Sequence, residues 1–203
     1  MPAGFSVSTP VVIQSGHTEA KGTVFADWNA PAPSGSNAVL TKAVASARIG
    51  ERWVERPLNG LGKVQLGAKP KLFVGLEPGG ARSSGGPLDP AKAWGAPLEL
   101  VLAPGQTLPA WLKVSRQGHE DLVTFFAENL PHGVIVADIG LNGVLIPKGE
   151  SEREIFFNAA RWVPEQDRLF YLIEQQVGRQ TSRPVLLKIR KSGGGATAAV
   201  RVP

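Results

Sequence analysis

The amino-acid sequence predicts an all-β protein built from short strands. One run of residues after another alternates between apolar and polar side chains, which is the period of a half-buried strand. The 203 residues include 24 glycines and 17 prolines, and these residue types favour frequent turns over long helices. No stretch sustains apolar residues at the three-and-four spacing of a helix together with capping signals.

Residues 107–116 show the clearest alternation. Leu108 begins a set of every-second-residue apolar side chains that we expect to face a core. Trp111 and Lys113 belong to the opposite face, which we expect to face solvent. Further strands of this kind are predicted in seven other segments: 98–102, 121–127, 134–136, 144–146, 152–159, 168–177 and 183–190. Short strands at intervals of about ten residues, separated by Gly and Pro, are typical of an immunoglobulin-like β-sandwich.

The N-terminal part predicts a shorter module. Strands are expected near residues 11–14, 18–27, 39–49, 52–56 and 63–66, with a hairpin turn at Ile49-Gly50-Glu51-Arg52. Gly67-Ala68-Lys69-Pro70 reads as a break between modules. We therefore predict two immunoglobulin-like antiparallel β-sandwich modules, the first incomplete. Their expected bounds are 1–68 for the truncated module, 69–192 for a fuller module with a Gly/Pro-rich insertion at 77–95, and 193–203 for a tail.

A phrase repeated in the sequence supports this modular organisation. Met1–Val7 and residues 130–136 share a Pro-x-Gly pair followed by apolar residues, and a shared pattern of Ile, Gly, Glu, Ala and Pro follows each copy. Ile13, Gly16, Glu19, Ala26 and Pro31 match Ile146, Gly149, Glu152, Ala159 and Pro164 at one offset. Internal repetition of this kind indicates stacked modules. Because Met1 stands where the second copy has Leu130, we expect either a fragment of a longer protein or a start site that leaves the first repeat incomplete.

Composition limits the classes of function. The chain has no Cys, which excludes disulfides, thiolate metal sites and Cys nucleophiles. No apolar run reaches transmembrane length, and no signal peptide is visible. The net charge of +5 is spread along the chain. Small basic groups such as Lys188 and Arg190 are interpreted as outward charges on strands that block edge-to-edge association, so nucleic-acid binding is not expected. Membrane insertion is not expected either, because the apolar runs are too short.

The sequence does not point to an enzyme. His17, His119 and His132 lie in predicted turns, no Gly-x-Ser-x-Gly elbow occurs, and no cofactor motif is present. Tyr171, near the start of a late strand, fits the tyrosine corner of immunoglobulin-like folds. We assign no catalytic or metal-binding residue and expect no cofactor. Whether Glu120, Asp121 and Asp138 bind a cation stays open, since they lack the dense oxygen spacing of calcium loops.

Five tryptophans stand out in a chain with few aromatic residues. Alternation places Trp111 on the outer face of its strand, and Trp94 falls in the Gly/Pro-rich insertion. An outward indole can stack on a sugar ring or fill a partner's pocket, so Trp111 and Trp94 are the candidate binding residues. The alternative is that they cover each other or a module junction. We expect Trp162 to plug one end of the second sandwich.

Several turn motifs resemble a known group of repeats. They are Ala103-Pro104-Gly105-Gln106-Thr107, Arg116-Gln117-Gly118, Leu130-Pro131-His132-Gly133-Val134 and Ile146-Pro147-x-Gly149. Together they are similar to immunoglobulin-like and fibronectin-type-III-like repeats of large secreted or envelope proteins of bacteria, often found beside pre-peptidase C-terminal-type domains. The resemblance covers roughly residues 98–190. It implies a non-catalytic module in a secreted or cell-envelope protein and carries over no ligand-binding residue.

The function that we expect is therefore a structural or interaction module, of the spacer or adhesion type, in an exported bacterial protein. Its expected partners are other domains of the parent protein and a cell-surface protein or glycan. The alternative is a carbohydrate-binding module that uses the exposed tryptophans.

Overall fold

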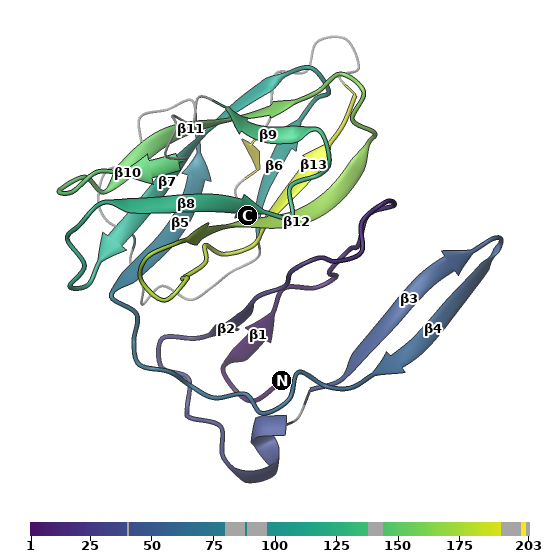
Figure 1. The fold of residues 1–203 in the computed structure, drawn as a ribbon, viewed down its shortest axis with the longest axis horizontal. Helices are drawn as coiled ribbons and strands as arrows, with labels where there is room; N and C mark the ends of the chain where they lie inside the picture. Colours follow the sequence, from purple (N-terminus) through teal and green to yellow (C-terminus); the bar gives the residue numbers. More distant parts are fainter. Residues whose placement is uncertain (40, 80–87, 89–96, 138–143, 192–199, 202–203) are drawn as a thin grey trace. The chain divides into compact units, whose positions relative to one another are not determined.

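The computed structural model describes residues 1–39, 41–79, 88, 97–137, 144–191 and 200–201 (Figure 1). Within these residues the protein is all-β, as the sequence predicts, and one short 3-10 helix, η1 (Gly35–Val39), interrupts the strands. Among the described helical segments, none is long and apolar enough to span a membrane. The chain divides into two compact units: unit 1 is Met1–Val7 with Thr23–Lys69, and unit 2 is Ser8–Gly22 with Pro70–Pro203. Residues 8–22, which we expected in the first module, thus belong to unit 2.

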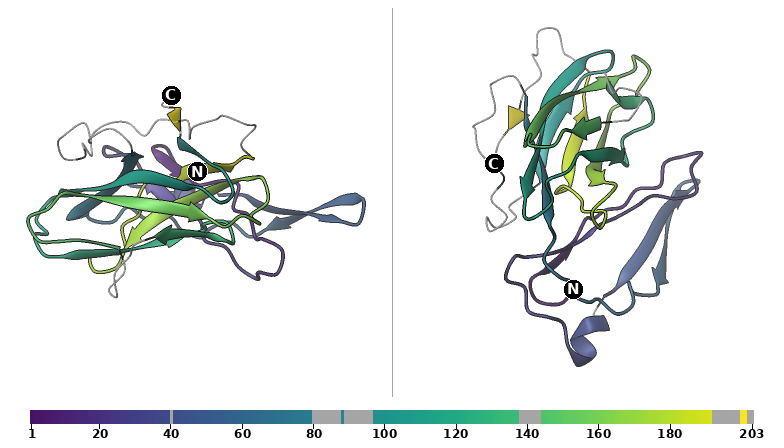
Figure 2. Two further views of the ribbon diagram at one scale, coloured as in Figure 1. Left: turned by 90° about the horizontal axis from the view of Figure 1, so that it is seen from above. Right: turned by 60° about the vertical axis from the view of Figure 1, so that its left-hand side comes forward.

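Unit 2 is a sandwich of two sheets (Figure 2). The four-stranded sheet has the order β5-β7-β11-β9, with bounds Leu72–Pro78, Thr107–Arg116, Glu152–Ala159 and Val134–Ala137. The six-stranded sheet has the order β10-β8-β12-β13-β6-β14, with bounds Val144–Ile146, Val123–Glu128, Gln166–Glu174, Val185–Ile189, Leu98–Leu102 and Val200–Arg201. All described pairings are antiparallel except that of β6 with β13, which is parallel.

One apolar core lies between these sheets. Strand β7 contributes the every-second-residue set that begins at Leu108, and each member is at most 2% exposed. Phe157 of β11 meets Phe170 of β12 edge to face, with ring centroids 5.2 Å apart, which joins the two sheets at the centre. The alternation in the sequence therefore identifies the core face of β7 correctly.

The outer face of β7 differs from the prediction. Lys113 is only 2% exposed and Ser115 only 3%. Lys113 lies opposite Gly75 of β5, and a Cβ built at Gly75 would be 2.7 Å from the Leu88 methyl carbons. Leu88 therefore covers this part of the sheet. The period of two correctly predicts which side chains share a face, but it carries no information about a distant segment that covers that face.

Unit 1 contains two two-stranded sheets among its described residues. Strand β1 (Phe5–Val7) pairs with β2 (Val24–Ala26), and β3 (Ala43–Ile49) pairs with β4 (Arg52–Leu58). The predicted hairpin turn is present, since Ile49 pairs with Arg52. The strands predicted at 11–14 and 63–66 are not formed.

The repeated phrase adopts the same structure in both copies. Offsets of 129 and 133 residues map the β1–β2 pairs Phe5↔Ala26 and Val7↔Val24 onto Val134↔Ala159 and Val136↔Phe157 of β9 and β11, in the same register. The turn bonds correspond as well. Phe5 N donates to Pro2 O at 3.1 Å and Val134 N to Pro131 O at 2.9 Å, while Asp27 N donates to Gly4 O and Ala160 N to Gly133 O, both at 2.8 Å. The repeat in the sequence is therefore a repeat in the fold.

Candidate functional site

The two predicted binding residues have different outcomes. Trp111 lies half-buried on the outer face of β7, where its neighbours across the sheet are Glu77 of β5 and Glu154 of β11. Trp94 lies outside the described residues. An aromatic ring beside carboxylates suits a polar, ring-shaped ligand. The assignment of Trp111 as a binding residue stays a prediction.

Of the two tryptophans that the structure describes in unit 2, Trp162 is the more exposed, with 60% of its surface accessible. The expectation that it plugs one end of the sandwich is wrong, because the ring is exposed, whereas its neighbour Val163 is 2% exposed and belongs to the core. The indole lies on Gly133: a Cβ built there would be 2.5 Å from the indole Cη2. Gly133 has φ +86°, as the Pro-x-Gly turn predicts. The absence of a side chain at this position thus leaves room for the indole.

Two histidines lie beside this indole. The ring centroids of His132 and Trp162 are 5.1 Å apart, and those of His17 and His132 are 6.0 Å apart. All three side chains are exposed. We call this group, His17, His132 and Trp162, the His–Trp cluster. It offers apolar ring surface and imidazole hydrogen-bonding groups on one face of unit 2.

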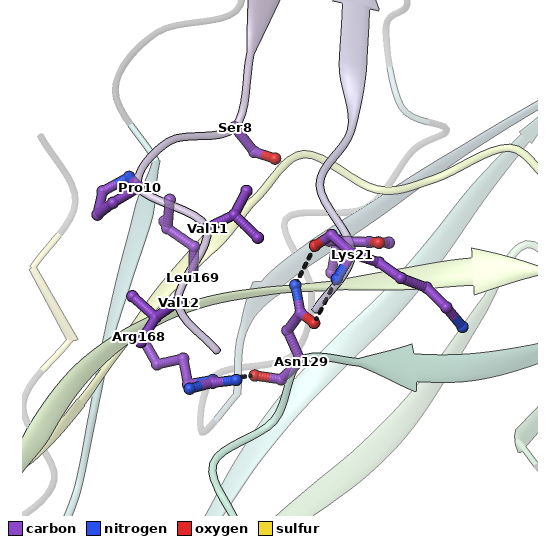
Figure 3. Close-up of a pocket in the computed structure, with 9 residues that line it drawn as sticks. Ser8, Pro10, Val11, Val12, Lys21, Asn129, Arg168 and Leu169 are labelled. Carbon is purple, nitrogen blue, oxygen red and sulfur yellow. Dashed lines mark hydrogen bonds between the residues drawn. The ribbon is translucent and has the colours of Figure 1, made fainter. Parts of the chain in front are cut away.

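Polar contacts hold residues 8–22, the segment that carries His17, against the sandwich. The Gln14 side-chain amide donates to Gln166 Oε1 at 3.0 Å, and Gln14 Oε1 accepts from His132 N at 3.2 Å. Further along, Lys21 Nζ lies 2.9 Å from Glu128 Oε1, and the Lys21 backbone exchanges hydrogen bonds with the Asn129 side chain (Figure 3). The segment is therefore fastened at its middle and near its end.

A pocket lies beneath this segment (Figure 3). Arg168, 7% exposed, lines it and donates to the Asn129 carbonyl at 2.9 Å. Burial lowers the pKa of the Arg168 guanidinium. The other lining residues include Pro10, Val11, Val12, Leu169 and Tyr171. Because Arg168 is bonded to the chain, its charge serves to hold the turn at Asn129, which has φ +65°.

Arg116 organises a group of loops at the end of β7. Its guanidinium donates to four backbone carbonyls, at 2.8 to 3.1 Å, those of His119, Asp121, Pro147 and Glu150. The Arg-x-Gly motif of the sequence therefore ends a strand and ties two loops together. This is a structural role, because a fork of five donors is matched to carbonyl oxygens of the same chain.

The sequence left open whether Glu120, Asp121 and Asp138 bind a cation. Asp121 is 81% exposed and lies 3.8 Å from Lys148, while Asp138 lies outside the described residues. No group of three His, Cys, Asp or Glu side chains within the part of the chain that the structure describes could hold a metal ion.

Sequence reasoning placed His17 and His132 correctly in exposed turns but did not bring them together with Trp162. The three residues of the cluster come from three segments of the chain. The repeat was the one feature of the sequence that could have indicated that they lie close together. Gly133 lies in the turn before β9 and Trp162 in the turn after β11, and in the first copy Gly4 likewise lies close to Ala30. His17 reaches the cluster only because residues 8–22 pack on unit 2.

Comparison with known proteins assigns no family. No family model matches the chain, and no curated protein matches its sequence. Among solved structures, a conjugative transposon lipoprotein from Bacteroides eggerthii DSM 20697 matches at 9% identity with a TM-score of 0.31, over 60% of this chain and 98% of that chain. The resemblance to bacterial immunoglobulin-like repeats therefore stays a prediction, whereas the all-β fold is observed.

Proposed function

We propose that the chain is a non-catalytic module of a tandem array in an exported bacterial protein, where it spaces or attaches other domains. The observation that carries the proposal is the repeat, in which the pairs Phe5↔Ala26 and Val134↔Ala159 recur in one register with the same turn bonds. Repeated sandwich units suit spacing because each one is built by the same local rules. The positions shared by the two copies form turns in both, and in the second copy they also supply core side chains such as Ile146 and Ala159, 0% and 5% exposed.

Protease treatment of intact cells tests export. An epitope tag inserted after Gly118, in an exposed turn, should be cut by protease added to cells that express the full parent protein. A cytoplasmic protein in the same cells serves as the control and should stay intact. Protection of both tag and control until the cells are lysed would contradict export.

Domain replacement distinguishes spacing from attachment. Replacing residues 70–191 with an unrelated β-sandwich of similar length should preserve the parent protein's function if the module acts as a spacer. Loss of function would indicate that a surface of unit 2 binds a partner. A quantitative phenotype of the parent protein, such as cell adhesion, provides the measurement.

A second candidate function is carbohydrate binding, and the exposed indole of Trp162 favours it. The ring is 60% exposed and supported from beneath by Gly133, while His132 stands at its side. A sugar ring stacked on the indole could exchange hydrogen bonds with the imidazole. These contacts support the His–Trp cluster as a candidate site, in addition to the predicted Trp111.

A glycan array tests this second candidate. If the His–Trp cluster is the site, Trp162→Ala should abolish glycan binding, while Trp53→Ala, at a tryptophan 72% exposed in unit 1, should leave it unchanged. If the predicted site is used instead, Trp111→Ala should abolish it. Absence of binding by the native chain would eliminate carbohydrate binding as a function.

A further inference from the structure

The β3–β4 hairpin of unit 1 is a two-stranded sheet whose side chains are mostly exposed (Figure 1). Only Ala43 and Val54 are half-buried, and every other residue of the two strands is exposed. Its large apolar side chains are 56% to 72% exposed: Ile49 and Leu58 on one face, and Val44 and Trp53 on the other. A two-stranded hairpin is at best marginally stable alone in water, and exposed apolar surface of this kind marks an interaction site.

The turn of the hairpin fixes which backbone groups point away from it. Gly50, with φ +61°, and Glu51 form a two-residue turn that closes on the hydrogen-bonded pair Ile49↔Arg52. Hydrogen-bonded pairs alternate with non-bonded pairs along an antiparallel ladder, and the backbone groups of the non-bonded pairs point outward. The outward-pointing residues are Val44, Ser46 and Arg48 on β3 and Trp53, Glu55 and Pro57 on β4.

The outer edge of β4 is blocked. Pro57 has no N–H group, and it stands at an outward position, where the hairpin ladder does not need one. The Glu55 carbonyl already accepts a hydrogen bond from Arg56 Nη1 at 3.1 Å. Proline and charged side chains on an edge strand prevent another strand from pairing with it. A further strand therefore does not add to the hairpin on this side.

The outer edge of β3 has none of these protections. Among the described residues, no hydrogen bond reaches the outward backbone groups of Val44, Ser46 or Arg48. The strand contains neither proline nor glycine, and Arg48 is its one charged residue. Three of its seven residues are alanines, whose small side chains let another strand approach closely. β3 thus presents an open edge.

We propose that the chain forms a two-fold symmetric dimer in which β3 pairs antiparallel with β3 of a second copy, so that two hairpins make one four-stranded sheet. A two-fold interface requires a surface that is complementary to itself. β3 meets this requirement when the pairing is centred on Ser46, because all seven of its residues then pair and the outward-pointing residues meet one another. Arg48 lies opposite Val44 of the second copy, so no like charges oppose each other.

The same register brings the exposed apolar side chains together. The rows that form are Ile49 with Ala43 and Leu58 of the second copy on one face, and Val44 with Arg48 and Trp53 of the second copy on the other. In the first row two large side chains flank a small alanine, and in the second they flank the aliphatic stem of an arginine. A sheet of four strands also passes the size at which sheets become stable on their own. The dimer depends on neither export nor carbohydrate binding.

Light scattering on the full chain tests the proposal. The native mass should be about twice the 21.5 kDa of one chain. Ser46→Pro removes an outward N–H group from β3 without removing a bond of the hairpin, so this variant should be monomeric. Glu55→Pro makes the same change directly opposite, on the blocked edge, and should stay dimeric. A monomeric native chain or a dimeric Ser46→Pro variant would overturn the proposal.

Hydrogen exchange locates the interface. In the native dimer the outward amides of Val44 and Arg48 should exchange at least roughly tenfold more slowly than in the Ser46→Pro monomer. The outward amide of Trp53, on β4, should exchange equally fast in both. Rapid exchange at Val44 and Arg48 in a native dimer would mean that another surface forms it, which would also overturn the proposal.

Cysteine variants test the register independently of the proline substitutions. The chain has no Cys, so only introduced thiols can link two copies. Under oxidising conditions Ser46→Cys should form a covalent dimer, because directly opposed residues have the Cα separation of a disulfide. Val44→Cys alone should not, whereas a mixture of Val44→Cys and Arg48→Cys chains should. Equal cross-linking of the Ser46→Cys and Val44→Cys chains would contradict the pairing centred on Ser46.

Discussion

Glu174 of β12 is a fully buried carboxylate that holds the turn after its own strand. Its two oxygens accept hydrogen bonds from the backbone N–H groups of Gln176, Val177 and Gln180 at 2.7, 2.6 and 2.8 Å. We expect Glu174→Gln to lower the free energy of unfolding by about 2–3 kcal/mol, since a charged acceptor is lost and an amide N–H group meets a donor. Urea unfolding of the variant measures this.

The control for this prediction is Glu154→Gln, which removes an exposed carboxylate from the outer face of β11. Its free energy of unfolding should stay within about 0.5 kcal/mol of the native value. If the two variants were equally stable, the turn would not depend on the Glu174 charge.

Arg116 acts by the shape of its guanidinium as much as by its charge. The arginine bonds to four carbonyls through three nitrogens that lie in one plane. A lysine at this position keeps the positive charge but has a single nitrogen, so it cannot reach all four carbonyls. We expect Arg116→Lys to destabilise unit 2 by about 2 kcal/mol and to speed thermolysin cleavage before Leu122, in the loop that follows β7. Arg153→Lys, which loses a single bond to Leu145 O at 3.0 Å, is the matched control and should change both quantities less.

At the scale of elements, alanine substitutions in the turns at Gly133 and Gly149 distinguish the cost of backbone strain from the cost of a side-chain collision. Gly133 and Gly149 have φ of +86° and +80°, but only a Cβ at Gly133 would collide with Trp162, because nothing lies within 4 Å of one at Gly149. Gly149→Ala should cost about 1–2 kcal/mol of stability from the left-handed backbone alone. Gly133→Ala should cost about 2 kcal/mol more and move the Trp162 ring. Thermal unfolding and tryptophan fluorescence measure the two effects, and equal losses would contradict the contact.

Strands in unit 2 could be predicted closely from the sequence because each has one buried face. The expected segments 107–116 and 152–159 coincide with β7 and β11, since both lie inside a sheet and alternate cleanly. Prediction failed at 11–14, where the same apolar pattern as β10 is present without a strand. The difference is the partner: β10 pairs with β8, whereas residues 11–14 belong to no ladder among the described residues.

The candidate site was less predictable than the fold. Trp162 was expected to plug one end of the sandwich, but the sequence does not reveal which of the two adjacent apolar residues, Trp162 or Val163, turns inward. The His–Trp cluster also depends on a segment from the first copy packing on unit 2. Such long-range placement leaves no period in the local sequence.

At the scale of the whole molecule, alkaline unfolding reports the burial of one phenol. Tyr171 is the only tyrosine of the chain and is 3% exposed on β12. Burial raises the pKa of its phenol above the ordinary 10.0, the Glu128 carboxylate raises the pKa further, and Arg179 opposes the shift. The folded protein thus holds this proton more tightly than the unfolded chain. The associated stability is fully present below a pH of about 10 and is lost as pH rises through the folded pKa.

This linkage predicts a distinct optical and thermodynamic signature. The tyrosinate absorbance near 295 nm should appear at higher pH in the folded protein than in the chain unfolded by urea, and one residue accounts for the whole signal. Tyr171→Phe should flatten the fall in unfolding free energy above a pH of about 10, because the group that releases its proton on unfolding is gone. Identical slopes for the two proteins would show that the phenol titrates alike in the folded and unfolded states.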